Sequence, residues 1–168
     1  MANTPYDPDP VVKRAFLFSC YTGLRFSDIE NLTWGKLRKN DAGRTLIKFV
    51  QEKTSKPEYP PISEKAVRWL PERGTAKDDD KIFDLTSNGY TNVHLRNWVM
   101  KAGLKKRVTY HVSRHTAATL LLSLGVSLTT VQKIMGHSDI KTTLRYAKVI
   151  DKNITDAVDI LDKLPDSV

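Results

Sequence analysis

Glycines divide the C-terminal half of the chain into segments that are each long enough for one helix. Gly103, Gly125 and Gly136 each follow a stretch of helical character, and glycine commonly ends a helix because it readily adopts the left-handed conformation. The positions of these glycines and the apolar patterns between them predict helices over 87–102, 109–124 and 128–135. A further helix, which carries Tyr146, is predicted from Asp139, and a last one over 151–163.

The N-terminal half mixes helix and strand patterns. The apolar residues after Pro10 predict a helix that Gly23 ends, and 27–30 matches a capping box, so a second short helix is expected just after Arg25. Further patterns predict strands over 33–37 and 45–51, a short edge strand at 58–60 and a helix over 63–70. The expected fold class is mainly α with a small antiparallel β-sheet (α+β).

Positive charge is concentrated in one third of the sequence. Lys and Arg number 27 against 19 Asp and Glu, and the 54-residue stretch from Leu85 to Ser138 has no acidic residue. That stretch holds seven of the basic residues, so the rest of the chain is close to neutral. A one-sided basic segment is typical of proteins that bind a polyanion such as nucleic acid, and a solvated basic surface without a partner is the alternative that charge alone leaves open.

Length and composition exclude several other classes of protein. A chain of 168 residues corresponds to about one domain. Its single cysteine, Cys20, excludes an internal disulfide and a multi-cysteine metal site. No apolar run approaches the roughly 18 residues of a membrane span, and residues 1–10 lack the order of a signal peptide. We therefore expect a cytoplasmic protein without membrane contact.

Five short motifs occur in a fixed order along the chain. They are Thr22–Ile29, Gln51–Thr54, His111–His115, Met135–Ser138 and Thr142–Ala147. Together they resemble the signature of the tyrosine recombinases, also called phage-type integrases, and the resemblance covers about residues 8–149. It implies the fold of the DNA breaking–rejoining enzymes, encoded by a bacterium, a phage or another mobile element, and double-stranded DNA as the partner.

The resemblance assigns a nucleophile and two phosphate ligands. Tyr146 would attack a DNA phosphate and form a 3′-phosphotyrosine, a covalent intermediate that needs neither ATP nor a metal cofactor. Arg25 and Arg114 would hold the two non-bridging oxygens, because a planar guanidinium meets a phosphate with two parallel hydrogen bonds. Arg114 lies within the stretch that has no acidic residue, which disfavours an ordinary surface ion pair.

Three further residues complete the predicted catalytic set. His111 precedes Arg114 by three residues, so both lie on one helical face, and it would assist proton transfer or bind the phosphate. His137 would donate another hydrogen bond to the transition state. Lys53 would protonate the departing 5′ oxygen from a hairpin tip, although Lys56 on the same tip is an alternative.

Three alternative interpretations compete with recombination. His111 and His115 are spaced like zinc ligands, but residue 112 is Val rather than the Glu of zinc proteases, so no metal is expected. Residues 119–146 have the pattern of a helix-turn-helix regulator, which would bind DNA without cutting it. A type IB topoisomerase would use related tyrosine chemistry to relax supercoils. Covalent attachment to DNA separates the regulator from the two enzymes, and strand exchange separates the enzymes.

The resemblance also predicts domain organisation. Residues 1–168 correspond to the catalytic domain alone, without the N-terminal core-binding domain that precedes it in the family. Residues 151–168 would form a C-terminal helix with an apolar stripe that docks on a neighbouring subunit or folds back on its own domain. The full-length enzyme is expected to be a homotetramer on DNA, and this chain by itself a monomer.

Overall fold

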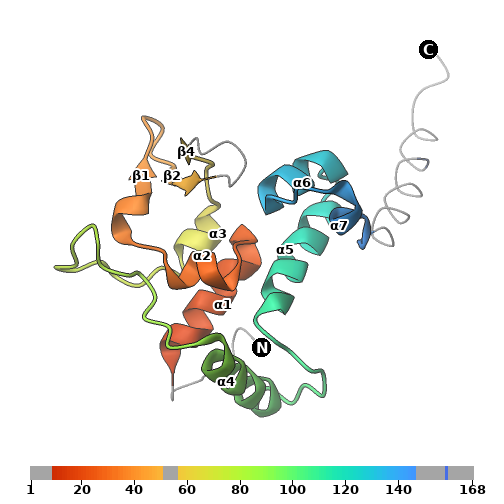
Figure 1. The fold of residues 1–168 in the computed structure, drawn as a ribbon, viewed down its shortest axis with the longest axis horizontal. Helices are drawn as coiled ribbons and strands as arrows, with labels where there is room; N and C mark the ends of the chain where they lie inside the picture. Colours follow the sequence, from red (N-terminus) through yellow and green to blue (C-terminus); the bar gives the residue numbers. More distant parts are fainter. Residues whose placement is uncertain (1–8, 51–56, 147–157, 159–168) are drawn as a thin grey trace. The chain divides into compact units, whose positions relative to one another are not determined.

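The computed structural model describes residues 9–50, 57–146 and 158 (Figure 1). The chain forms two compact units, residues 1–116 and 117–168, each with its own apolar core. The helices are α1 Pro10–Thr22, α2 Phe26–Glu30, α3 Glu64–Val67, α4 Asn88–Lys101, α5 His111–Ser123, α6 Leu128–Met135 and α7 Ile140–Leu144. The strands are β1 Leu37–Lys39, β2 Thr45–Ile47, β3 Phe49–Val50 and β4 Pro57–Glu58. The predicted fold class, mainly α with a small antiparallel sheet, is confirmed.

Helix α1 is fixed at both ends by local chemistry. The Asp9 carboxylate accepts hydrogen bonds of 3.1 Å from the backbone N–H groups of Val11 and Val12, which satisfies two free donors of the first turn. At the other end Gly23 has a φ of 73°, a left-handed conformation that glycine adopts without a steric penalty. Its N–H donates to the Ser19 carbonyl at 2.8 Å, and the chain then turns directly into α2.

The second helix begins where the sequence predicted, but its cap is different. The residue before α2 is Arg25, and the Asp28 carboxylate accepts a 2.9 Å hydrogen bond from the Arg25 backbone N–H. The capping box predicted at 27–30 is therefore wrong by two residues. Asp28, the third residue of α2, performs the role that was assigned to Glu30, because a carboxylate there reaches back to the N-cap amide.

The sheet consists of two small antiparallel pairs. Strand β1 pairs with β2, and β3 pairs with β4. The strand predicted over 33–37 is wrong for most of its length, because residues 34–36 form a 3-10 turn and the strand starts only at Leu37. The predicted strand over 45–51 is split after Ile47, and the predicted edge strand corresponds to β4 at Pro57–Glu58.

An aromatic cluster holds the first unit together. The ring of Phe16 on α1 meets the rings of Trp98 and Tyr110 edge to face, with centroids 6.2 and 5.9 Å apart, and Phe26 on α2 contacts Tyr110 at 5.1 Å. The Tyr110 hydroxyl donates to the Ala15 carbonyl at 2.9 Å. Because Tyr110 directly precedes α5, this cluster fixes the start of α5 relative to α1, α2 and α4.

The second unit has a smaller core built from α5, α6 and the turn after α7. Its buried residues are Ala117, Ala118, Leu122, Val131, Met135 and Tyr146. Helix α6 matches the predicted 128–135, but α7 ends at Leu144. The sequence had predicted Tyr146 within this helix, and that prediction is wrong. Tyr146 lies in the turn after α7. The predicted helix over 151–163 falls almost wholly outside the described residues.

Within the described part of the chain, no helix has the length and apolar character needed to cross a bilayer.

Candidate active site

A small cavity on the first unit brings together three of the six predicted catalytic residues. The cavity measures about 70 Å³ and is lined by Leu24, Arg25, Phe26, Asn88, Tyr110, His111, Ser113 and Arg114. Two guanidinium groups and an imidazole thus share one cavity whose lining includes no carboxylate. This is the electrostatic setting that binds an anion, and residues from 25 to 114 in the sequence contribute to it.

Arg114 is the buried member of this cluster. Only 6% of its surface is exposed, and its Nη1 donates a hydrogen bond to the Gly23 carbonyl. That carbonyl belongs to the residue that ends α1, in the short connection that also carries Arg25. The bond therefore fixes the Arg114 guanidinium against the segment that presents the other arginine.

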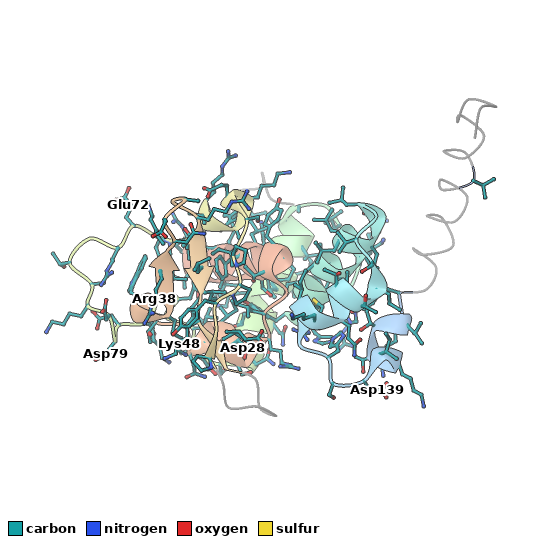
Figure 2. The ribbon with its side chains drawn as sticks, turned by 90° about the horizontal axis from the view of Figure 1, so that it is seen from above. Asp28, Arg38, Lys48, Glu72, Asp79 and Asp139 are labelled. Atoms are coloured by element: carbon teal, nitrogen blue, oxygen red, sulfur yellow. The ribbon has the colours of Figure 1, made fainter. Side chains whose placement is uncertain are left out.

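The connection from α1 to α2 is held at two further points. The Ser19 hydroxyl donates to the Leu24 carbonyl at 2.9 Å, and the Arg25 N–H donates to Asp28, which is labelled in Figure 2. The backbone of residues 23–25 is thus bonded at each residue to a side chain. The Arg25 side chain itself is exposed, so a rigid backbone places a guanidinium that remains accessible to a ligand.

A buried serine pair connects α1 to α5. The hydroxyls of Ser19 and Ser113 lie 2.7 Å apart, and both residues are 0% exposed. The Ser113 hydroxyl also contacts the Tyr110 carbonyl at 2.6 Å. Since Ser113 precedes Arg114, and Ser19 holds the segment before Arg25, this pair determines the separation of the two arginines.

His111 lies on the exposed side of the cavity. Its ring meets that of His115 edge to face, with centroids 4.5 Å apart and an interplanar angle of 89°. The spacing of four residues therefore brings the two rings into contact, as expected on one helical face. Among residues 9–50, 57–146 and 158, no group of three His, Cys, Asp or Glu side chains is arranged to hold a metal ion.

His137 and Tyr146 belong to the second unit. The Nδ1 atom of His137 lies 2.9 Å from the Thr143 hydroxyl, and the Gln132 side-chain amide donates to the His137 carbonyl at 3.1 Å. Gly136 ends α6, with a φ of 58°, and His137 follows it directly. The side chain of Asp139, labelled in Figure 2, then caps α7 by accepting from the Lys141 N–H at 2.9 Å.

The predicted nucleophile is largely buried. Tyr146 is 9% exposed, packs in the apolar core of the second unit, and donates its backbone N–H to the Thr143 carbonyl at 3.1 Å. Thr143 thus contacts both predicted catalytic residues of this unit, one through its hydroxyl and the other through its carbonyl. The predicted general acid, Lys53, and its alternative, Lys56, lie outside the described residues.

Sequence reasoning missed three polar residues: Asn88 and Ser113, which line the small cavity, and Ser19, which contacts Ser113. Ser19 and Ser113 lie in segments that looked like helix interior, and Asn88 looked like an ordinary first residue of α4. One sequence signal was present for Ser113, because a small hydroxyl residue stands between His111 and Arg114, at a position where a core helix usually has an apolar side chain. For Ser19 and Asn88, only the tertiary structure reveals the contact.

A larger cavity of about 580 Å³ lies elsewhere on the first unit and contains none of the six predicted residues. Its lining includes Asp28, Lys48 and Asp79, which Figure 2 labels, together with Asp78. Its three carboxylates outnumber its two lysines, Lys36 and Lys48, so the lining does not favour an anion. The smaller cavity, with two arginines and no carboxylate, has the appropriate charge.

Comparison with known proteins assigns the fold to a class of DNA enzymes. The structure resembles the catalytic domain of bacteriophage HP1 integrase, with a TM-score of 0.62 and 28% identity over 90% of this chain and 82% of that one. A XerA recombinase gives a TM-score of 0.65 with 24% identity, covering 89% of this chain and 57% of that one, which supports the fold alone. The architecture is therefore that of an integrase catalytic domain.

The sequence comparisons identify the family. The profile of the phage integrase family matches residues 1–153, so the chain belongs to that family. A tyrosine recombinase of Pseudothermotoga lettingae is 31% identical over 157 residues, which cover 88% of this chain and 52% of the relative. The recombinase XerD of Rhizobium meliloti is 33% identical over 150 residues, covering 82% and 47%. The chain thus spans about half the length of these relatives.

Proposed function

We propose that this chain carries the catalytic centre of a site-specific tyrosine recombinase. The observation that supports the proposal most strongly is the cavity shared by Arg25, His111 and Arg114, three residues that the sequence motifs single out independently. A DNA phosphodiester is an anion of suitable size for two guanidinium groups, and the excess of basic residues between 85 and 138 favours a polyanionic substrate. Among the similar structures, XerH is bound to its difH DNA substrate.

The proposed reaction is a balanced transesterification. The Tyr146 phenol gives up its proton, for which His111 is the proposed acceptor, and its oxygen attacks the phosphorus, forming a bond to the 3′ phosphate as the bond to the 5′ oxygen breaks. The 5′ oxygen takes a proton from the general acid, assigned to Lys53, and leaves as a hydroxyl. The 5′ hydroxyl of a partner strand then attacks the phosphotyrosine and releases the phenol. One phosphodiester is exchanged for another, so the reaction requires no energy source.

The remaining residues stabilise charge. Arg25 and Arg114 bind the non-bridging oxygens, on which negative charge accumulates in the transition state, and His111 assists the proton transfer or binds the same phosphate. His137 donates a further hydrogen bond, and its contact with Thr143 orients the imidazole ring. The arginines and the lysine together provide the positive charge that metal ions provide in two-metal nucleases.

The proposal extends to the whole protein. Residues 1–168 act as the catalytic domain, with residues 151–168 docking on their own or a neighbouring subunit, and the complete enzyme works as a homotetramer on double-stranded DNA. Similar proteins include an integrase of the transposon Tn1549 in complex with DNA, which favours a role in a mobile element. A cytoplasmic location follows from the substrate.

A covalent-trapping experiment tests the proposed function. The chain is incubated with a duplex that carries the cognate core sequence and a nick just 3′ of the scissile phosphate. The short cleaved fragment that bears the free 5′ hydroxyl then diffuses away and the phosphotyrosine accumulates. Wild-type protein should give a band of slower mobility on a denaturing gel, and Tyr146→Phe should give none while binding the duplex with the same affinity. Tyr59→Phe, which removes a phenol from the other unit, is the matched control and should react like the wild type.

Two results would contradict the proposal. Covalent product from Tyr146→Phe would assign the nucleophile to another residue. Tight binding of DNA without covalent product from the wild type, on a substrate that an authentic recombinase cleaves, would favour the regulator. Exchange of strands between two marked duplexes then separates a recombinase from a topoisomerase of type IB.

A further inference from the structure

The anion cavity contains an amide side chain that the catalytic motifs do not include. Asn88, the first residue of α4, lines the cavity together with Arg25, His111 and Arg114. It lies 63 residues after the first arginine and 26 residues before the second, so only the fold brings it there. An asparagine can present either a donor or an acceptor to a ligand, and the orientation of its amide decides which.

A chain of hydrogen bonds fixes that orientation. The backbone N–H of Tyr110 can only donate, and it donates to Asn92 Oδ1 at 2.7 Å. Asn92 must therefore direct its Nδ2 the other way, where it donates to Asn88 Oδ1 at 2.8 Å. The Asn88 oxygen is thus occupied as an acceptor, and its Nδ2 group is the part of the amide that can bind a ligand.

We propose that Asn88 is a further phosphate ligand of the active site. Its Nδ2 donates a hydrogen bond to a non-bridging oxygen of the DNA phosphate held by Arg25, His111 and Arg114. The Tyr110–Asn92–Asn88 chain prevents the amide from flipping, because a flip would place the Asn88 oxygen against the anion and two amide nitrogens against each other. Asn88 adds a directional donor to a cavity whose other ligands supply charge. This inference rests on the proposed function.

A pair of isoelectronic substitutions on α4 tests the contact. Asn88→Asp replaces the donor with a negative charge at the cavity, and Asn97→Asp places the same charge on an exposed position of the same helix, about 13 Å further along its axis. Both variants change the net charge equally. We expect N88D to form covalent product at least about tenfold more slowly than N97D, since a hydrogen bond to a charged group is lost. Equal rates for the two variants would overturn the proposal.

A substrate with a neutral scissile phosphate tests whether Asn88 contacts that phosphate. Replacing one non-bridging oxygen of the scissile phosphate with a methyl group removes the charge that the carboxylate introduced in N88D would repel. The deficit of N88D relative to N97D should shrink on that substrate and persist when the methyl group is placed on a neighbouring phosphate. A deficit that is the same at both positions would show that Asn88 does not contact the scissile phosphate.

A binding measurement separates this inference from the proposed function. The pair of NMR signals from the Asn88 side-chain NH2 group is assigned by its absence from the spectrum of N88D. The NH2 pair of Asn97, assigned in the same way from N97D, serves as the control. Adding duplex DNA should shift the Asn88 pair and leave the Asn97 pair in place, whether or not the chain cleaves DNA. An Asn88 pair that stays in place while the backbone amides of Arg25 and His111 shift would overturn the inference alone. No shift at any of them would overturn both proposals.

Discussion

The two units of the chain hold their polar residues in different ways. In the first unit, Arg114 bonds to a carbonyl 91 residues earlier in the sequence, and the Ser19–Ser113 contact joins residues 94 apart. In the second unit, the Nδ1 atom of His137 contacts the hydroxyl of Thr143, only six residues away. The arginine cavity therefore depends on hydrogen bonds between distant segments. The described contacts of His137 are local, whereas Tyr146 combines a local backbone hydrogen bond with packing against α5 and α6.

This difference has consequences for stability and function. A site built from distant segments is lost when any of the contacts between α1, α4 and α5 is lost, because each fixes the others. A site built from one helical turn and two capped helices persists as long as the local segment is folded. Substitutions that remove one of these long-range hydrogen bonds should therefore affect folding and catalysis together, whereas removing the contact between Thr143 and His137 should affect catalysis more than folding.

The largest expected effect is on Arg114. Arg114→Ala should lower the rate of covalent product formation by about 10²-fold or more, as typically results when a transition-state donor is removed. It should also lower the free energy of unfolding by about 1–3 kcal/mol, because the buried Gly23 carbonyl loses its donor. Single-turnover cleavage and urea denaturation measure the two effects.

Arg114→Lys and Arg73→Ala are the matched controls. The lysine keeps the charge but not the planar pair of donors, so cleavage should stay well below that of the wild type. Arg73 forms an exposed ion pair of 2.6 Å with Asp78, and its loss should change neither quantity appreciably. Cleavage at the wild-type rate by Arg114→Ala would remove this residue from the active site.

A smaller effect is expected in the second unit. Thr143→Val keeps the shape of the side chain and removes the hydroxyl that contacts His137, so cleavage should slow by up to about tenfold through a poorly oriented imidazole. Thr142→Val, a half-buried neighbour, is the control for helix propensity. If Thr143→Val slowed cleavage no more than Thr142→Val does, the hydrogen bond would have no role in positioning His137.

The serine pair should show coupling between its members. Ser19→Ala and Ser113→Ala, singly and together, form a double-mutant cycle, and we expect a coupling free energy of about 0.5–1.5 kcal/mol in unfolding, with a cleavage rate lowered a few-fold. Thr91→Val is the control, because Thr91 Oγ1 is the buried side-chain atom without a hydrogen-bond partner among the described residues. Strict additivity in both measurements would mean that the two hydroxyls act independently.

The smallest effect concerns alkaline pH and the core of the first unit. Burial raises the pKa of the Cys20 thiol from 9.0 to about 12, although a hydrogen bond with Thr116 partly offsets it, and burial also raises the pKa of Tyr110. Both groups remain neutral in the folded chain after they ionise in the unfolded chain. The fold is therefore fully stabilised below about pH 9 and loses stability as the pH rises from 9 towards 12.

Cys20→Ala tests this contribution. The free energy of unfolding of the variant should fall less steeply between neutral pH and about pH 10.5 than that of the wild type, while cleavage at neutral pH is unchanged. Parallel slopes for the two proteins would mean that the thiol ionises equally in both states. The second unit contains no cysteine, so we assign this part of the alkaline sensitivity to the first unit.

Local signals were sufficient for most helices. Gly23, Gly103, Gly125 and Gly136 each lie at or near the end of a helix, as predicted, because a left-handed residue stops a helix whatever surrounds it. Predictions that depended on competition between neighbouring caps or on strand length were less accurate. The capping box of α2 uses Arg25 and Asp28 and not the predicted pair at 27 and 30. Residues 34–36 form a 3-10 turn where a strand over 33–37 was predicted.

The sequence alone determined the family, the helical character and a set of polar residues in a recognisable order, because capping, glycine punctuation and motif spacing are properties of short segments. The tertiary structure decided that Arg25, His111 and Arg114 line one cavity, and it added Ser19, Ser113 and Asn88 to their surroundings. When the hydrogen-bond partner of a side chain lies about 90 residues away, the sequence around that side chain shows no periodic pattern that predicts the contact. The role of such a side chain is fixed only when packing brings the two segments within hydrogen-bonding distance.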